Sequence, residues 1–83
     1  METKLKFRYD READILYINK LPPYSEQESE EIGDEVIVRM NPKTGEIENI
    51  EVLFFSTRLL RSDLLELPVS ADFKLGVIES PTE

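Results

Sequence analysis

Asn41-Pro42-Lys43-Thr44-Gly45 is the stretch that decides the fold, because it lies between two runs that alternate like β-strands. Asn suits the first position of a tight turn, Pro fixes φ at the second, and Gly accepts a positive φ where the chain returns. The flanking runs, residues 36–40 and 46–55, direct successive side chains to opposite faces. The sequence therefore predicts an antiparallel hairpin centred on this turn.

The second strand of that hairpin carries a shift in its alternation. Ile47 and Ile50 are three residues apart, whereas apolar residues on one face of a regular strand are two apart. One extra residue near Asn49 would bring both isoleucines to the same face. We therefore predict a β-bulge at this point.

A second hairpin is expected nearer the N-terminus. Residues 4–9 alternate basic and apolar side chains, and residues 15–18 form a β-rich apolar run. Asp10 and Asp14 bracket the polar stretch between them, where a carboxylate can accept hydrogen bonds from backbone N–H groups. Across the whole chain, the residues predicted to form turns are Asp10, Asp14, Gly33, Asn41, Pro42 and Gly45.

The periodicity becomes helical after the last of these strands. Ser56 is a good N-cap, and leucines at helical spacing continue to Pro68, which predicts a short helix over residues 56–67. In the C-terminal extension, residues 68–83, alternation over residues 69–78 favours a fifth strand, although Gly76 weakens that reading. The extension is thus the least determined part of the fold.

These elements together predict a single small α+β domain over residues 1–83. Two antiparallel hairpins form one sheet within residues 4–55, and the helix packs on it. A chain this short has a small stability margin, and paired leucines widen the apolar stripe of the helix. We therefore expect a homodimer.

An acidic segment separates the two hairpins and is predicted to be a connecting loop over residues 21–35. Pro22 and Pro23 end the preceding strand, because proline cannot donate to a strand ladder. Six carboxylates and no basic residue follow, in a chain whose net charge is -8. The six are Glu26, Glu28, Glu30, Glu31, Asp34 and Glu35. They are the predicted partner-binding residues, and a merely solvated loop is the alternative interpretation.

Few side chains in this sequence are suited to catalysis. It has no His, Cys or Trp, so the commonest groups for proton transfer, nucleophilic attack and zinc binding are missing. We predict no catalytic residue, no metal ligand and no cofactor. The alternative is a small hydrolase or divalent-metal enzyme that uses carboxylates of the first turn and the acidic segment. A calcium-loop template fails there, because Glu31 holds its glycine position and Ile37 its twelfth position.

Net charge limits the kinds of partner. At -8, with a pI near 4.5, the chain is repelled by nucleic acid and anionic lipid and attracted to a basic protein. No apolar run could cross a bilayer and no secretory leader is recognisable, so we expect a cytoplasmic protein. The leading function is a non-enzymatic interaction module for a basic partner.

Three stretches resemble a known family. Residues 9–18 read Tyr-Asp-x-Glu-Ala-Asp-x-Leu-Tyr-Ile, and residues 31–38 and 45–53 supply strand and turn patterns. Over residues 4–60 the chain resembles the small prokaryotic domain of unknown function 2283. The resemblance implies a compact domain built from hairpins, with no catalytic residues to assign. It also implies an antitoxin-like or accessory role, because genes for such domains often neighbour small toxin-like proteins.

Overall fold

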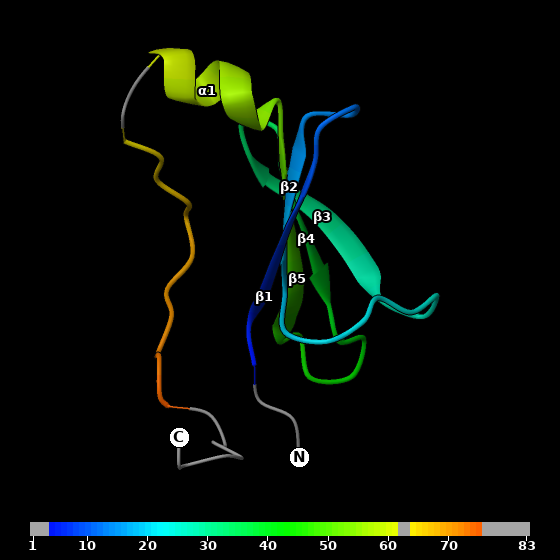
Figure 1. Cartoon of the computed structure of the whole chain (residues 1–83). Helices are drawn as coiled ribbons and strands as arrows, with labels where there is room; N and C mark the ends of the chain where they lie inside the picture. The colour runs from blue at the N-terminus through cyan, green and yellow to red at the C-terminus, as the bar shows by residue number, and fades with distance from the viewer. Residues whose placement is uncertain (1–3, 62–63, 76–83) are drawn as a thin grey trace, which may run out of the picture.

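The computed structural model describes residues 4–61 and 64–75, in which a five-stranded antiparallel sheet is followed by one short helix (Figure 1). The sheet order is β1-β2-β5-β4-β3. The predicted α+β class and both predicted hairpins are confirmed. The elements are β1 (Lys6–Asp10), β2 (Ile15–Asn19), β3 (Glu28–Gly33), β4 (Val36–Met40), β5 (Ile47–Leu53) and α1 (Phe55–Arg61).

The turn between β4 and β5 has the geometry that its residue types favour. Asn41 Oδ1 accepts hydrogen bonds from the N–H groups of Lys43 at 2.8 Å and Thr44 at 3.1 Å, with Pro42 between them. Gly45 has a φ of 76°, and its N–H donates to the Asn41 carbonyl at 2.8 Å. A left-handed φ at this position favours glycine.

The predicted β-bulge is confirmed in β5. Arg39 pairs with Asn49, but its neighbour Met40 pairs with Ile47, so Glu48 is the extra residue. Glu48 and Asn49 are both buried, with 6% and 2% of their surface exposed. A regular strand would direct these two successive side chains to opposite faces. The bulge therefore creates a buried polar site within the sheet.

Part of the predicted acidic loop is a strand. Residues 28–33 form β3, which pairs with β4 at the edge of the sheet, so the loop prediction for residues 21–35 is wrong at its centre. Five of the six β3 residues are exposed. Hydrogen bonds to β4 hold such an edge strand, and it needs no apolar alternation that sequence could reveal.

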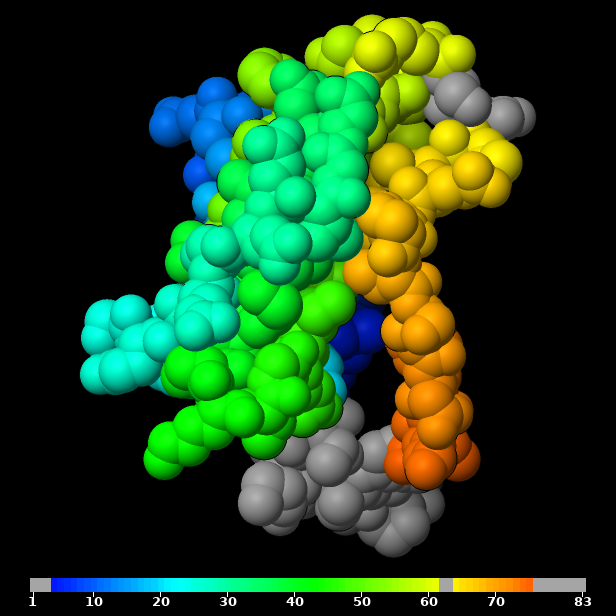
Figure 2. All heavy atoms as spheres, turned by 180° about the vertical axis from the view of Figure 1, so that it is seen from behind, coloured from blue at the N-terminus to red at the C-terminus, as the bar shows by residue number. Residues whose placement is uncertain are grey.

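The helix and the C-terminal segment also differ from prediction. α1 ends at Arg61, and residues 64–67 are not helical, so the predicted helix over residues 56–67 is too long. Residues 64–75, called the strap below, run extended beside the sheet (Figures 1 and 2). Residues 69–75 form no strand, and residues 76–78 of the predicted fifth strand lie outside the described residues. The fifth strand of the described sheet is β3 instead.

One face of the sheet is apolar and holds a small core. Among the apolar side chains that the structure describes, Val36, Val38 and Val52 are buried. Pro68 of the strap lies on this side, because its Cγ is 3.6 Å from the position that a Cβ on Gly33 would take. On β1, β2, β4 and β5, strand register assigns to this apolar face Phe7, Tyr9, Leu16, Ile18, Val36, Val38, Ile50 and Val52. At the edge strand β3, the same side of the sheet carries Glu28 and Glu30.

Candidate functional site

Two aspartates of the first turn have different partners. Asp10 Oδ1 accepts hydrogen bonds from the N–H groups of Glu12 at 3.1 Å and Ala13 at 3.2 Å. Asp14, with a φ of 60°, reaches α1 instead, and its carboxylate accepts from the Ser56 N–H and the Ser56 hydroxyl, each at 2.9 Å. Asp14 therefore caps the first turn of a helix by binding Ser56, 42 residues later in the chain. Ser56, the predicted N-cap, lies within the helix.

Tyr9 completes this contact. Its hydroxyl donates to Asp14 Oδ1 at 2.6 Å, and its ring meets Phe55 edge-to-face at a centroid distance of 5.8 Å. The hydrogen bond from Tyr9, followed by the backbone bond from Ser56, lowers the pKa of Asp14. The same bond raises the pKa of Tyr9. Asp14 is thus held as a carboxylate by several donors, which suits a structural role.

We expect Asp14→Asn to weaken the start of α1 and to remove the acid sensitivity of this contact. The folded-state pKa of Asp14 lies below its ordinary value of 3.8. Its stabilising effect is therefore present above pH 3.8 and is lost as the pH falls through the folded-state pKa. The amide of the variant takes up no proton in that range. The NMR shift of the Ser56 amide proton, followed during acid titration, measures this difference.

Glu12→Gln in the same turn is the matched control for this titration. Glu12 is exposed, and in the described residues its side chain forms no hydrogen bond or ion pair with α1. In the Glu12→Gln variant, the Ser56 amide signal should therefore follow the wild-type titration curve. A wild-type curve in Asp14→Asn would show that another group caps the helix.

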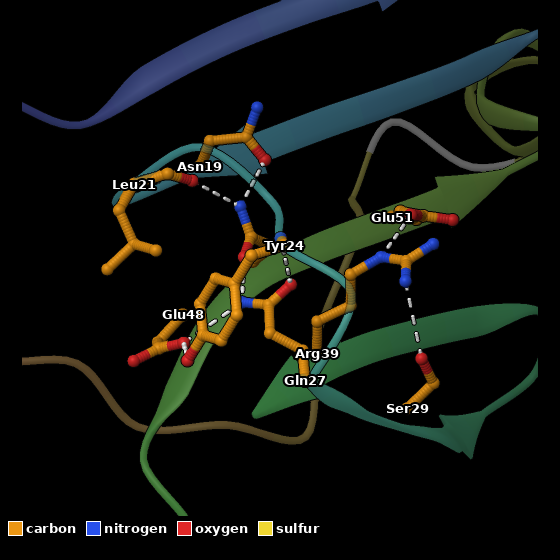
Figure 3. Close-up of polar contacts among 9 residues, drawn as sticks. Asn19, Leu21, Tyr24, Gln27, Ser29, Arg39, Glu48 and Glu51 are labelled. Atoms are coloured by element: carbon orange, nitrogen blue, oxygen red, sulfur yellow. Dashed lines mark hydrogen bonds and ion pairs between the residues drawn. The ribbon is translucent and has the colours of Figure 1, made fainter. Parts of the chain in front are cut away.

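A network of amide side chains centred on the buried Asn49 lies over the bulge (Figure 3). Asn49 Nδ2 donates to Asn19 Oδ1 at 2.9 Å and to the Leu21 carbonyl at 2.7 Å. Asn49 Oδ1 accepts from Gln27 Nε2 at 2.7 Å. Asn49 thus joins the central strand β5 to the end of β2 and to the connection that leads into β3.

Glu48 anchors the other half of this network (Figure 3). Its carboxylate accepts hydrogen bonds from the Tyr24 hydroxyl at 2.8 Å, Gln27 Nε2 at 2.9 Å and Asn41 Nδ2 at 3.1 Å. The bonds from Gln27 and then Tyr24 lower the pKa of Glu48, and the bond to Glu48 raises the pKa of Tyr24. Donors therefore keep the buried carboxylate ionised, and the whole network fixes the approach to β3.

The predicted partner-binding residues lie before, on and after β3. All are exposed except Glu35, which is half-buried and has a φ of 63°. Gly33, predicted to form a turn, ends β3, and the positive φ of the turn into β4 falls on Glu35 instead. Glu26 precedes β3; Glu28, Glu30 and Glu31 lie on it; Asp34 and Glu35 form the turn.

The three glutamates on β3 have no cation of their own. Within residues 4–61 and 64–75, no salt bridge or side-chain hydrogen bond involves them. Arg39, on the adjacent strand, is bound by Glu51 at 2.9 Å and also donates to the Ser29 hydroxyl at 3.4 Å. In the part of the chain that the structure describes, no strand pairs with the outer backbone groups of β3. β3 is therefore an open edge, with its side chains at the surface in Figure 2.

The alternative chemistry gains no observation in its favour. Among the described residues, no group of three or more carboxylates is placed to hold a metal ion. Of the first-turn carboxylates considered for hydrolysis, which are Asp10, Glu12 and Asp14, Asp10 and Asp14 accept the hydrogen bonds described above. In the same part of the chain, no helix is long and apolar enough to span a membrane.

The fold and the site define a small antiparallel sheet domain with an acidic, open edge strand. The chain belongs to the family described as protein of unknown function (DUF2283), which matches residues 6–56. The match runs from the start of β1 into α1 and so includes the whole sheet. It confirms the family predicted from residues 9–18, 31–38 and 45–53. Neither the curated proteins nor the solved structures compared with the chain include a match.

The sequence did not indicate the amide network or the capping role of Asp14. Asn19, Tyr24, Gln27 and Asn49 are common surface residue types, and their spacing matches no motif. The one available signal was the predicted bulge, since it turns Glu48 and Asn49 to one side.

Proposed function

We propose that this protein is a cytoplasmic, non-enzymatic interaction module that binds a basic protein partner along β3. The observation that supports it is the open strand edge, where Glu28, Glu30 and Glu31 are exposed and form no salt bridge with any other described residue. The antitoxin-like or accessory role implied by the family resemblance fits a module of this kind. A basic partner would also be attracted by the net charge of -8.

The mode of binding follows from the geometry of an edge strand. An extended partner segment can hydrogen-bond to the outer backbone groups of β3 and extend the sheet. Glu28 and Glu30 are two residues apart and share one face, opposite Met40 and Val38 in register. Their Cα atoms are therefore about 7 Å apart, as are alternate residues of any strand. The partner segment should carry Lys or Arg at alternate positions.

A synthetic peptide that alternates lysine and valine tests this function. We expect it to bind, measured by fluorescence anisotropy, with an affinity that falls as salt is added. The variant Glu28→Gln/Glu30→Gln/Glu31→Gln should bind roughly tenfold to a hundredfold more weakly at low salt, since exposed ion pairs contribute up to about 1 kcal/mol each.

Two controls separate the edge from general charge attraction. Glu12→Gln/Glu46→Gln/Glu66→Gln removes the same charge elsewhere and should bind nearly as well as wild type. A peptide with N-methyl groups along its backbone keeps its lysines but cannot pair with β3. If the control triple variant loses as much affinity as the β3 variant, β3 is not the docking site.

A further inference from the structure

The apolar face of the sheet is covered on one side only. Over β4 and β5, Val36, Val38 and Val52 are buried beside the strap. Over β1 the cover ends, since Phe7 is 63% exposed. The space-filling view shows an opening between the strap, in orange, and β1, in dark blue (Figure 2). Within residues 4–61 and 64–75, the β1 side of this face therefore has no second layer.

A sheet with one apolar face is stable when another layer packs on that face. The strap supplies part of this second layer. Its residues Leu65, Leu67 and Val69 are half-buried, whereas the residues between them are exposed. Further along the strap, Phe73 and Leu75 are 79% and 90% exposed. The three valines buried among the described residues make a small core, and domains of this size often complete their cores by association.

We propose that a second copy of this chain covers the exposed part, apolar face against apolar face, in a two-fold dimer. Such packing places two sheets about 10 Å apart, as in a β-sandwich. The interaction is separate from partner binding at β3 and does not require it. Each copy uses the same surface, which closes the assembly at two chains.

Charge placement permits this pairing despite the net charge of each copy. On β1, β2, β4 and β5 the eight residues of the apolar face are uncharged, and the carboxylates on the same side of the sheet, Glu28 and Glu30, lie on the far edge strand β3. The basic residues of β1 point to the opposite face, where the Arg8 guanidinium lies 4.4 Å from the Tyr17 ring centroid. The acidic strand β3 is four strand spacings from β1, or about 19 Å, well beyond a screening length of about 8 Å in physiological salt.

The exposed apolar area is sufficient for a specific contact. At roughly 200 Å² for a large side chain, the exposed fractions of the residues below correspond to roughly 600 Å² per copy. Specific interfaces begin at about 600 Å² per partner and average about 800 Å². The residues are Leu5 (38% exposed), Phe7 (63%), Tyr9 (41%), Phe73 (79%) and Leu75 (90%).

Phe7→Glu and Leu60→Glu form a matched pair of variants for the test. Each places a carboxylate on an exposed apolar site, one on the sheet face and one on α1, where Leu60 is 86% exposed. By light scattering at about 100 μM, we expect wild type and Leu60→Glu to have the mass of two chains. Phe7→Glu should have the mass of one chain, with an unchanged circular dichroism spectrum.

Three results would overturn the proposal. A monomeric wild type would show that the chain does not dimerise. A dimeric Phe7→Glu would show that the apolar face of the sheet is not the dimer interface. A monomeric Leu60→Glu with a dimeric Phe7→Glu would place the interface on the leucines of α1, as the sequence predicted.

A labelling experiment covers the case in which Phe7→Glu does not fold. The chain has no native cysteine, so Phe7→Cys and Leu60→Cys each introduce a single thiol. Maleimide should label Phe7→Cys several-fold more slowly at about 200 μM than at about 1 μM chain, because association buries the site. Leu60→Cys should react at one rate at both concentrations. Equal rates for Phe7→Cys would exclude this face.

Discussion

Asn49→Ala is expected to lower the free energy of unfolding by about 3 kcal/mol and the Tm by about 15 °C. The side chain is 2% exposed and makes three hydrogen bonds, to Asn19, Leu21 and Gln27. Truncation leaves these half-buried partners without the bonds that the buried amide made, and it leaves a cavity at the bulge. Thermal unfolding followed by circular dichroism measures the change.

Two further variants assign this loss to the hydrogen bonds. Asn49→Asp keeps the shape but loses the donor and adds a charge beside Glu48, so it should be at least as destabilising. Asn19→Ala combined with Asn49→Ala should cost less than the two changes added, since the residues share a bond at 2.9 Å. Strict additivity would show that the bond between them contributes nothing.

Val52→Ala is expected to cost about 2 kcal/mol, or about 10 °C in Tm. Val52 is fully buried, and register places it between Leu16 and Val36 on the apolar face. Removing two methyl groups loses their burial and leaves a cavity that a paired strand cannot close. The described core has few fully buried apolar side chains, so this loss is a large fraction of the free energy of unfolding.

Val69→Ala is the matched control for Val52. Val69 is half-buried on the strap, which is not paired with a strand of the described sheet. The chain can therefore adjust around the smaller residue. Its loss should be well under half that of Val52→Ala. Both variants are compared with wild type at one chain concentration, because association would raise the apparent Tm. Equal losses would mean that the strap is as much a part of the core as β5.

The two hairpins were predictable because the residues that favour each one lie within the hairpin itself. Asn41, Pro42 and Gly45 favour one turn, Asp10 favours another, and the alternation on either side fixes which face is buried. The bulge was also predictable, since the break in alternation is local. Short-range chemistry was sufficient in each case.

β3 and the strap were not predictable on the same basis. β3 reads as a polar loop, and only the unpaired edge of β4 makes it a strand. The leucines after Arg61 fit a helix by spacing, yet Leu65 and Leu67 are half-buried on an extended chain. Pairing and burial outweighed local preference in both segments, as they often do in small domains.

The candidate site was likewise predictable in part from the sequence. Sequence alone identified the acidic residues and the excess charge, because charge is a property of composition. It could not place Glu28, Glu30 and Glu31 on an open strand edge, or show that Arg39 is already bound to Glu51. Those facts depend on which strands become neighbours.

By itself, the sequence determined the α+β class, both hairpins, the bulge and the family, since turn chemistry and periodicity act over a few residues. Only the tertiary structure decided that β2 pairs with β5, that Asp14 caps α1 and that Asn49 holds the chain before β3. Each of these contacts joins residues at least 28 positions apart. No local preference encodes such a contact, because its free energy is gained only after the sheet has brought the two residues together.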